Sequence, residues 1–67
     1  MDGKLLRDLR EAKGESRFKL AVAVGTTPAT IQALENGATK NPRVPLLKNL
    51  AEHFGVTTDY LLGMEEK

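Results

Sequence analysis

Apolar residues recur three and four positions apart in several short stretches of the chain, and this spacing predicts amphipathic helices. The clearest case is a helix over residues 3–13, which Asp2 is placed to cap and which Gly14 terminates. Its apolar stripe consists of Leu5, Leu6, Leu9 and Ala12. No stretch alternates apolar and polar residues as a half-buried strand does, so the pattern predicts an all-α protein.

The next two helices are predicted over residues 17–24 and 28–36, with only a very short connection between them. A chain that reverses within so few residues needs a positive φ angle, and Gly25 adopts one without steric cost. Helices joined so tightly must also cross steeply, and the small residue Ala21 stands where they would meet. This combination of features is typical of a helix-turn-helix.

The rest of the chain is predicted to be a loop and two further helices. Residues 37–43 are polar and contain glycine and proline, as loops do, while helices are expected over 45–54 and 58–62. Residues 63–67 are expected to be a frayed tail. Because every connection is short, residues 1–67 are predicted to form a single all-α domain of five helices.

Composition narrows the possible chemistry. The chain has 67 residues, no cysteine and a single histidine, His53, so neither a disulfide nor a zinc site is predicted and no cofactor is implied. No triad, phosphate-binding glycine loop or paired carboxylates support catalysis, so we predict that the protein is not an enzyme and has no small-molecule substrate. Neither a membrane span nor a signal peptide is predicted, and a cytoplasmic location is expected.

Charge is distributed unevenly along the chain. Residues 1–48 contain nine Lys or Arg and five Asp or Glu, whereas residues 49–67 contain one Lys and four acids. Between Arg17 and Lys48 the only acid is Glu35. A basic middle with an acidic end suits a domain whose centre faces a polyanion, although an ordinary solvated surface would explain the charges equally well.

Residues 17–36 resemble the helix-turn-helix of the Cro and phage-repressor (XRE-like) family. The likeness extends to "LLRDLREAKG", "LENG" and "PLLKNLAEHFGVTTDYLLG", and it is closest to the N-terminal DNA-binding domains of lambdoid phage repressors in "ENGATKNPR". This resemblance implies a five-helix repressor-like domain whose helix 28–36 enters the major groove of double-stranded DNA. It also implies a two-fold dimer that reads two half-sites about 34–36 Å apart.

The resemblance also implies roles for individual residues. Phosphate contacts fall to Ser16, Arg17, Asn36, Lys40, Asn41 and Arg43, where Arg17 departs from the family's frequent Gln. The base-reading face falls to Thr27, Pro28, Ala29, Gln32 and Ala33. A partly buried ion pair between Arg10 and Glu35 would tie the first helix to the recognition helix. The usual dimer contact lies around Val44, Pro45, Val56 and Thr58.

The predicted reading face carries few polar side chains. Gln32 alone is a long polar residue, able to pair with adenine through two hydrogen bonds, although it would equally suit an exposed helix position. Pro28, Ala29 and Ala33 can make only apolar contacts, for which thymine methyl groups are the natural targets. A sequence code on this face would therefore combine thymine methyls, Gln32 and DNA deformability.

Two features leave alternatives open. Phe18 and Val22 stand at positions that the family usually fills with Ala or polar residues, and we favour an enlarged local core over an exposed apolar patch. His53 is expected at the surface.

Taken together, the pattern and the resemblance predict a DNA-binding transcriptional repressor that forms a homodimer, either in solution or only on DNA. The alternative is an antitoxin-like or anti-repressor-like protein-interaction module on the same fold, and the chain could be a complete protein or the front of a longer repressor.

Overall fold

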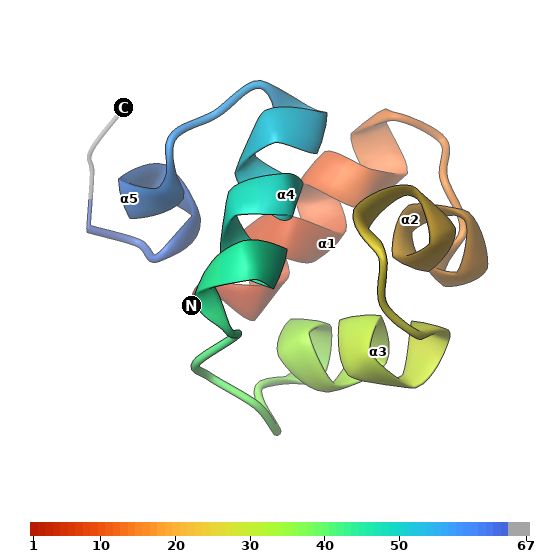
Figure 1. Ribbon diagram of the computed structural model, residues 1–67, viewed down its shortest axis with the longest axis horizontal. Coiled ribbons are helices and arrows are strands. Elements are labelled where there is room, and N and C mark those ends of the chain that lie inside the picture. The colour runs from red at the N-terminus through yellow and green to blue at the C-terminus, as the bar shows by residue number, and fades with distance from the viewer. Residues whose placement is uncertain (65–67) are drawn as a thin grey trace.

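The computed structural model describes residues 1–64 and shows that this part of the chain is helical without strands. Its elements are α1 (Gly3–Ala12), α2 (Arg17–Val24), α3 (Pro28–Asn36), α4 (Val44–Phe54) and α5 (Thr58–Leu61) (Figure 1). The all-α, five-helix prediction is confirmed, and the bounds of α2 and α3 agree with it.

The other three helices differ from their predicted bounds by one residue. Helix α1 ends at Ala12 because Lys13 is already its C-cap, and α5 ends at Leu61 with Leu62 as its C-cap. Helix α4 begins at Val44 rather than Pro45, because Arg43 has extended backbone angles and serves as the N-cap. Proline lacks an N–H and is tolerated in the first turn of a helix, so Pro45 does not have to be the first helical residue.

Four of the five helices start with a side chain that accepts a hydrogen bond from the backbone three residues later. The capping oxygens belong to Asp2, Ser16, Thr27 and Thr57. Such caps satisfy N–H groups that have no partner within the helix, and each is worth about 1 kcal/mol. This local chemistry explains why the sequence pattern located these helix starts correctly.

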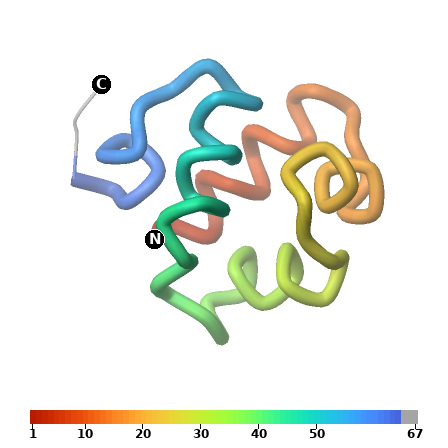
Figure 2. Tube along the Cα trace, viewed as in Figure 1, coloured from red at the N-terminus to blue at the C-terminus, as the bar shows by residue number. Residues whose placement is uncertain are grey.

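Helices α1 and α4 lie in the middle of the molecule, with α2 and α3 on one side and α5 on the other (Figures 1 and 2). Helix α3 packs against both α1 and α2, and α4 packs against α2 and α5. The fully buried side chains come from all five helices, and they are Leu6, Leu20, Ile31, Leu34, Leu50 and Leu61. Ala21 is buried as well, in keeping with its predicted place at the crossing of α2 and α3.

The start of α1 lies directly against the end of α3. A Cβ atom added to Gly3 would collide with the backbone oxygen of Leu34 and would lie 2.5 Å from that of Glu35. These are backbone atoms of a packed helix, so they cannot move aside as the tip of a flexible side chain would. Only glycine allows this approach, and the position of α3 relative to α1 depends on it.

We expect Gly3→Ala to lower the free energy of unfolding by about 1–3 kcal/mol, the usual cost of overpacking a close contact. The strain arises because α1 and α3 must separate to admit the new methyl group. Urea denaturation followed by circular dichroism measures the change. Lys4→Ala, at the neighbouring exposed position, serves as the control and should leave the midpoint nearly unchanged. Equal midpoints for the two variants would contradict the predicted contact.

The predicted tail is described only in part. The backbone N–H of Met64 donates to the carbonyl of Asp59 over 3.0 Å, so the first residues of the predicted tail continue the turn that follows α5. Residues 65–67 of the predicted tail lie outside the described residues.

Candidate nucleic-acid interface

The turn between α2 and α3 places α3 across the end of α2. In Figure 1 α2 is seen nearly end-on while α3 lies across the view, so the two helices cross steeply. Gly25 ends α2 with φ of +81°, and the hydroxyl oxygen of Thr27 accepts the backbone N–H of Thr30 to start α3. Ile31 and Leu34 are buried on the inner side of α3. The opposite side of α3 therefore faces outward.

The residues predicted to read bases lie on this outward side. Thr27, Pro28, Ala29 and Gln32 are exposed, whereas Ala33 is half-buried. Thr27 already uses its oxygen to cap α3, and its hydroxyl also lies 3.0 Å from that of Thr30. Gln32 is the long polar side chain on this face. The small apolar side chains of Pro28, Ala29 and Ala33 form the surface around it.

The residues predicted to contact phosphate flank α3 at both ends. They come from the start of α2, the end of α3 and the segment after it, and all except Arg17 are exposed: Ser16, Asn36, Lys40, Asn41 and Arg43. Ser16 caps α2, and the side-chain oxygen of Asn36 accepts the N–H of Ala38 over 2.9 Å. That bond leaves the Asn36 amide NH₂ facing solvent, so Asn36 retains a donor for an anion.

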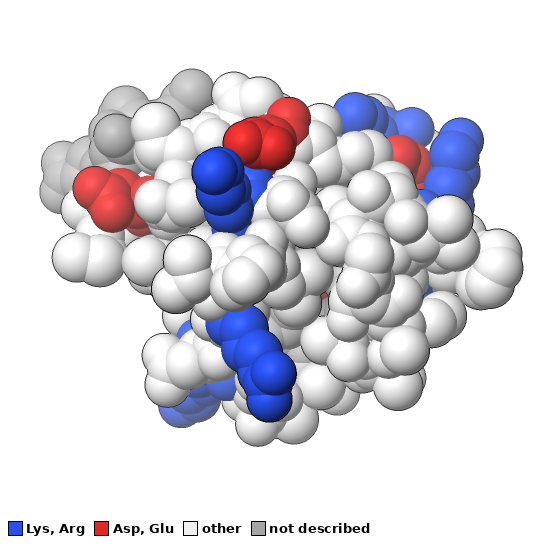
Figure 3. Space-filling model, viewed as in Figure 1, with Lys and Arg blue, Asp and Glu red and all other residues white. Residues whose placement is uncertain are grey.

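On the face shown in Figure 3, two groups of Lys and Arg atoms flank α2 and α3, and further blue atoms lie over α4. Lys and Arg atoms lie over the segment after α3 and the start of α4, and again around the corner between α1 and α2. The surface over α2 and α3 between them is almost entirely uncharged in the same view. This arrangement separates basic flanks, suited to phosphates, from a neutral centre suited to base edges.

The segment after α3 is also fixed from the N-terminus. The amino group of Met1 donates to the backbone carbonyl of Lys40 over 2.9 Å, and Figure 2 shows the N-terminus beside the start of α4. Sequence reasoning missed this contact, because residues so far apart carry no common pattern. The contact holds the backbone from which the Lys40 side chain projects.

The predicted ion pair between Arg10 and Glu35 is present. Arg10 Nε donates to Glu35 Oε2 over 2.6 Å and Arg10 Nη2 donates to Oε1 over 3.2 Å, with the two side chains 10 % and 2 % exposed. Arg10 Nη1 also donates to the backbone carbonyl of Glu15 over 2.8 Å. The hydrogen bond to Glu35 raises the pKa of Arg10 further above its ordinary value, so this guanidinium stays charged. The pair ties α1 to the end of α3.

A second arginine shares the same carboxylate. Arg17 Nε donates to Glu35 Oε1 over 3.1 Å, and the Arg17 side chain is 42 % exposed while that of Glu35 is 2 % exposed. Sequence reasoning placed Arg17 among the phosphate contacts but missed this ion pair. The sequence did contain one indication of this ion pair, because Glu35 is the only acid between Arg17 and Lys48.

A second polar contact joins the corner between α1 and α2 to the end of α4. His53 Nε2 lies 2.9 and 3.0 Å from the two carboxylate oxygens of Glu15, whose side chain is 7 % exposed. Lys13 adds a hydrogen bond to the His53 carbonyl over 3.2 Å, and its ammonium lies 5.8 Å from the centre of the Phe54 ring. The prediction that His53 is a surface residue is therefore wrong, because this packing leaves it half-buried.

The preferred interpretation of Phe18 and Val22 is also wrong. Each is 67 % exposed, so they do not enlarge the core but form an apolar patch on the outside of α2. The buried side of α2 is already filled by Leu20, Ala21 and Val24. At about 3.6 residues per turn, Phe18 and Val22 lie two positions before Leu20 and Val24 and therefore fall on the opposite side of the helix.

Because this patch is exposed, we expect Phe18→Ser and Val22→Ser each to change the free energy of unfolding by less than about 0.5 kcal/mol. Leu20→Ser on the same helix is the contrasting control, and it should be severely destabilising because Leu20 is fully buried. Thermal and urea denaturation of the three variants measure the difference. A large loss of stability in Phe18→Ser would mean that the ring packs against the core.

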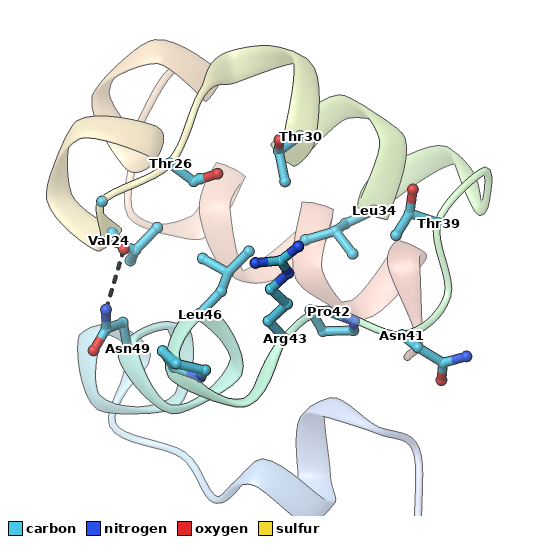
Figure 4. Close-up of a pocket in the computed structure, with 12 residues that line it drawn as sticks. Val24, Thr26, Thr30, Leu34, Thr39, Asn41, Pro42, Arg43, Leu46 and Asn49 are labelled. Atoms are coloured by element: carbon cyan, nitrogen blue, oxygen red, sulfur yellow. Dashed lines mark hydrogen bonds between the residues drawn. The ribbon is translucent and has the colours of Figure 1, made fainter.

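A cleft of about 590 Å³ opens between α3 and the start of α4. Its walls include Val24, Leu34 and Leu46, and Asn49 closes one end by donating to the Val24 carbonyl over 3.2 Å (Figure 4). The Arg43 side chain points into this cleft between Leu34 and Leu46, whereas Asn41 points away from it (Figure 4). Arg43 therefore stands beside α3 rather than at the far edge of the loop.

Within residues 1–64, His, Asp and Glu side chains do not gather into a group of three or more that could hold a metal ion. None of the helices among these residues is both long enough and apolar enough to cross a membrane.

Comparison with known proteins identifies the arrangement. A family model described as helix-turn-helix matches residues 6–61, which is most of the chain. The fold is also similar to a crystal structure of the P22 c2 repressor protein in complex with synthetic operator 9T. That match has a TM-score of 0.88 and 25 % sequence identity, and it covers 94 % of each chain.

Proposed function

The chain belongs to the helix-turn-helix family, and from that premise we propose that it is a transcriptional repressor that binds double-stranded DNA with α3 in the major groove. A repressor of this kind acts by occupying its operator, so the proposal requires no chemical step. The P22 c2 repressor, whose fold this chain shares, was crystallised on a synthetic operator. The geometry of this chain supports the same kind of partner.

The observation that carries the proposal is the position of α3 between two basic flanks. Ile31 and Leu34 hold one side of the helix in the core, and the opposite side projects without a partner among the described residues. Arg17 lies on one flank and Lys40 and Arg43 lie on the other. An α-helix fits the major groove of B-DNA, and cations on either side of it would meet the phosphates that border the groove.

The size of the molecule supports binding as a pair of copies. Its longest dimension is 28 Å, whereas half-sites for this kind of motif lie about 34–36 Å apart. One copy can therefore reach one half-site only. We propose a homodimer, formed in solution or only on DNA, with contacts around Val44, Pro45, Val56 and Thr58. Of these four residues Val44 is the most prominent, with 74 % of its surface exposed.

Base reading by the proposed interface would depend on few groups. Gln32 is exposed and can form two hydrogen bonds with adenine, while Pro28 and Ala29 offer apolar surface for thymine methyl groups. Few such contacts are available on this face, so much of the affinity should come from phosphates and some of the specificity from DNA shape. Selection of bound sites from a random duplex pool would show the preferred bases.

The test of the proposal is binding of the wild-type chain to a duplex of arbitrary sequence at low and then raised salt. We expect clear binding at low salt and a steep loss of affinity on raising the salt, because phosphate contacts release counterions. Fluorescence anisotropy of a labelled duplex measures both quantities. If no binding is detected at low salt, the protein is not a DNA-binding repressor.

The second candidate function, a protein-interaction module on the same fold, is favoured by one observation. Phe18 and Val22 expose an apolar patch on α2, and such patches often mark protein partners. Under this alternative Phe18→Ser and Val22→Ser abolish the regulatory activity that the protein has in cells. Its affinity for duplex DNA is undetectable or unchanged in these variants. Under the repressor proposal the cellular activity instead follows duplex affinity across all variants.

A further inference from the structure

We propose that Glu35 orients the Arg17 guanidinium in advance to donate hydrogen bonds to a DNA phosphate. This carboxylate would then serve the DNA interface as well as the fold. This inference rests on the proposed function and names a positioning role within the same site. Arg17 stands at a position that the resembling family often fills with Gln, whose uncharged amide could not form this ion pair. Glu35 would hold the guanidinium beside the start of α2 before any DNA arrives.

Arg17 is held at one edge by a buried carboxylate. Its Nε, at the inner edge of the guanidinium, donates to Glu35 Oε1 over 3.1 Å. Glu35 in turn is fixed by two bonds from Arg10, and its own side chain is 2 % exposed. The anchor for Arg17 is therefore a buried, immobile carboxylate and not a flexible surface acid.

The outer part of the Arg17 guanidinium remains available for an anion. Guanidinium has five N–H donors in a rigid fork, and only the Nε donor of Arg17 is used among residues 1–64. The side chain is 42 % exposed, so the Nη groups face solvent. A phosphate can accept from such a fork with two oxygens at once. Arg17 can thus keep its bond to Glu35 while it binds a phosphate.

The cluster of Arg10, Glu35 and Arg17 contains more positive than negative charge. Glu35 carries one negative charge between two arginines, so the group of Arg10, Glu35 and Arg17 keeps a net positive charge. Arg10 is 10 % exposed and uses its donors internally, which places the accessible part of that charge on Arg17. The flank at the start of α2 therefore attracts an anion even though its one acid is paired.

The variant Arg17→Lys separates the effect of positioning the guanidinium from the effect of its charge. Lys keeps the positive charge but has a single donor group, which cannot hold Glu35 by one edge and present a second, two-pronged edge to a phosphate. We expect Arg17→Lys to retain the salt dependence of duplex binding and to weaken affinity roughly threefold to tenfold, the cost of ordering one long side chain at an interface. Arg17→Gln should bind more weakly still and lose about 0.9 from the slope of log K against log salt.

The outcomes distinguish this inference from the proposed function. Wild-type binding together with an Arg17→Lys affinity equal to wild type would overturn the inference alone, because charge would then suffice. An unchanged salt slope in Arg17→Gln would likewise remove Arg17 from the phosphate contacts. Failure of the wild-type chain to bind duplex at low salt would overturn both. Circular dichroism of each variant checks that the helices are intact.

A spectroscopic measurement on the wild-type chain does not depend on any variant folding. Side-chain ¹⁵N spectra of Arg17 should show an Nε–H signal that exchanges slowly with water, both in the free protein and on an arbitrary duplex. Rotation of the Nη groups should slow only when the duplex is added. An Nε–H signal that exchanges as fast as that of exposed Arg43, or that loses its protection on DNA, would show that Glu35 does not position Arg17.

Discussion

Arg10→Ala is expected to lower the free energy of unfolding by about 3–5 kcal/mol, the usual cost of removing one partner of a buried ion pair. A domain of 67 residues has only about 3–10 kcal/mol of stability in total. The variant should therefore be largely unfolded at room temperature or have a strongly lowered melting temperature. Its DNA binding should fall with its folded fraction.

The physical reason is the number of groups that the Arg10 side chain satisfies. It gives two hydrogen bonds to the Glu35 carboxylate and a third to the Glu15 carbonyl, all at the junction of three helix ends. Glu35 cannot turn to solvent, because its side chain is 2 % exposed. Arg17 still pairs with Glu35 in the variant, so the loss should lie toward the lower end of the range.

Thermal denaturation followed at the helical circular dichroism signal measures this effect. Arg7→Ala is the matched control, because Arg7 lies on the same helix and pairs with Glu11 over 3.2 Å. Both side chains of that pair are more than half exposed, so removing it should cost no more than about 0.5 kcal/mol. Similar melting temperatures for Arg10→Ala and Arg7→Ala would refute the structural role of the buried pair.

Arg43→Glu is expected to weaken binding to any duplex by roughly 10- to 100-fold, because it removes a phosphate contact and places a negative charge beside the DNA backbone. The slope of log K against log salt should fall by about 0.9. The loss should be similar for duplexes of different sequence. A loss confined to one sequence would instead indicate that Arg43 reads bases.

Folding should tolerate this change. Arg43 is exposed and forms no side-chain hydrogen bond within the described part of the chain. It stands at the N-cap of α4, where a negative charge is favourable to the helix dipole. The reduced affinity of the variant can therefore be attributed to the interface and not to loss of structure.

Lys48→Glu is the matched control for Arg43→Glu. It makes the same change of charge on an exposed residue of the same helix, away from the cleft that Arg43 enters. Its effect on duplex affinity should be several-fold smaller, reflecting only the change in net charge. If the two variants lose the same affinity, Arg43 has no specific contact and the basic surface acts only through its overall charge.

The helices and the turn were predictable because their causes are local. The capping residues Ser16 and Thr27, the positive φ of Gly25 and the apolar spacing of Ile31 and Leu34 each act within a few positions of the chain. The fit of α2 and α3 to their predicted bounds follows from these signals. The outward face of α3 was predictable for the same reason, since helical spacing decides which residues share a side.

The two errors have different causes, one local and one in long-range packing. Phe18 and Val22 are large and apolar, as core residues are, but the space beneath α2 is filled by Leu20 and Val24. His53 is polar, as surface residues are, but the corner between α1 and α2 covers it and Glu15 forms a hydrogen bond with it. Glu15 lies 38 positions before His53, so no local pattern could indicate that contact.

The sequence by itself determined five helices, a helix-turn-helix and the outward face of α3, because capping, spacing and turn chemistry are encoded within single turns. Beyond the Arg10–Glu35 pair that the resemblance implied, only the tertiary structure decided which charges pair. It placed Arg17 on the carboxylate that Arg10 already holds, and it brought Gly3 against the end of α3. Both contacts join separate helices, and they exist only when the core has fixed how those helices pack.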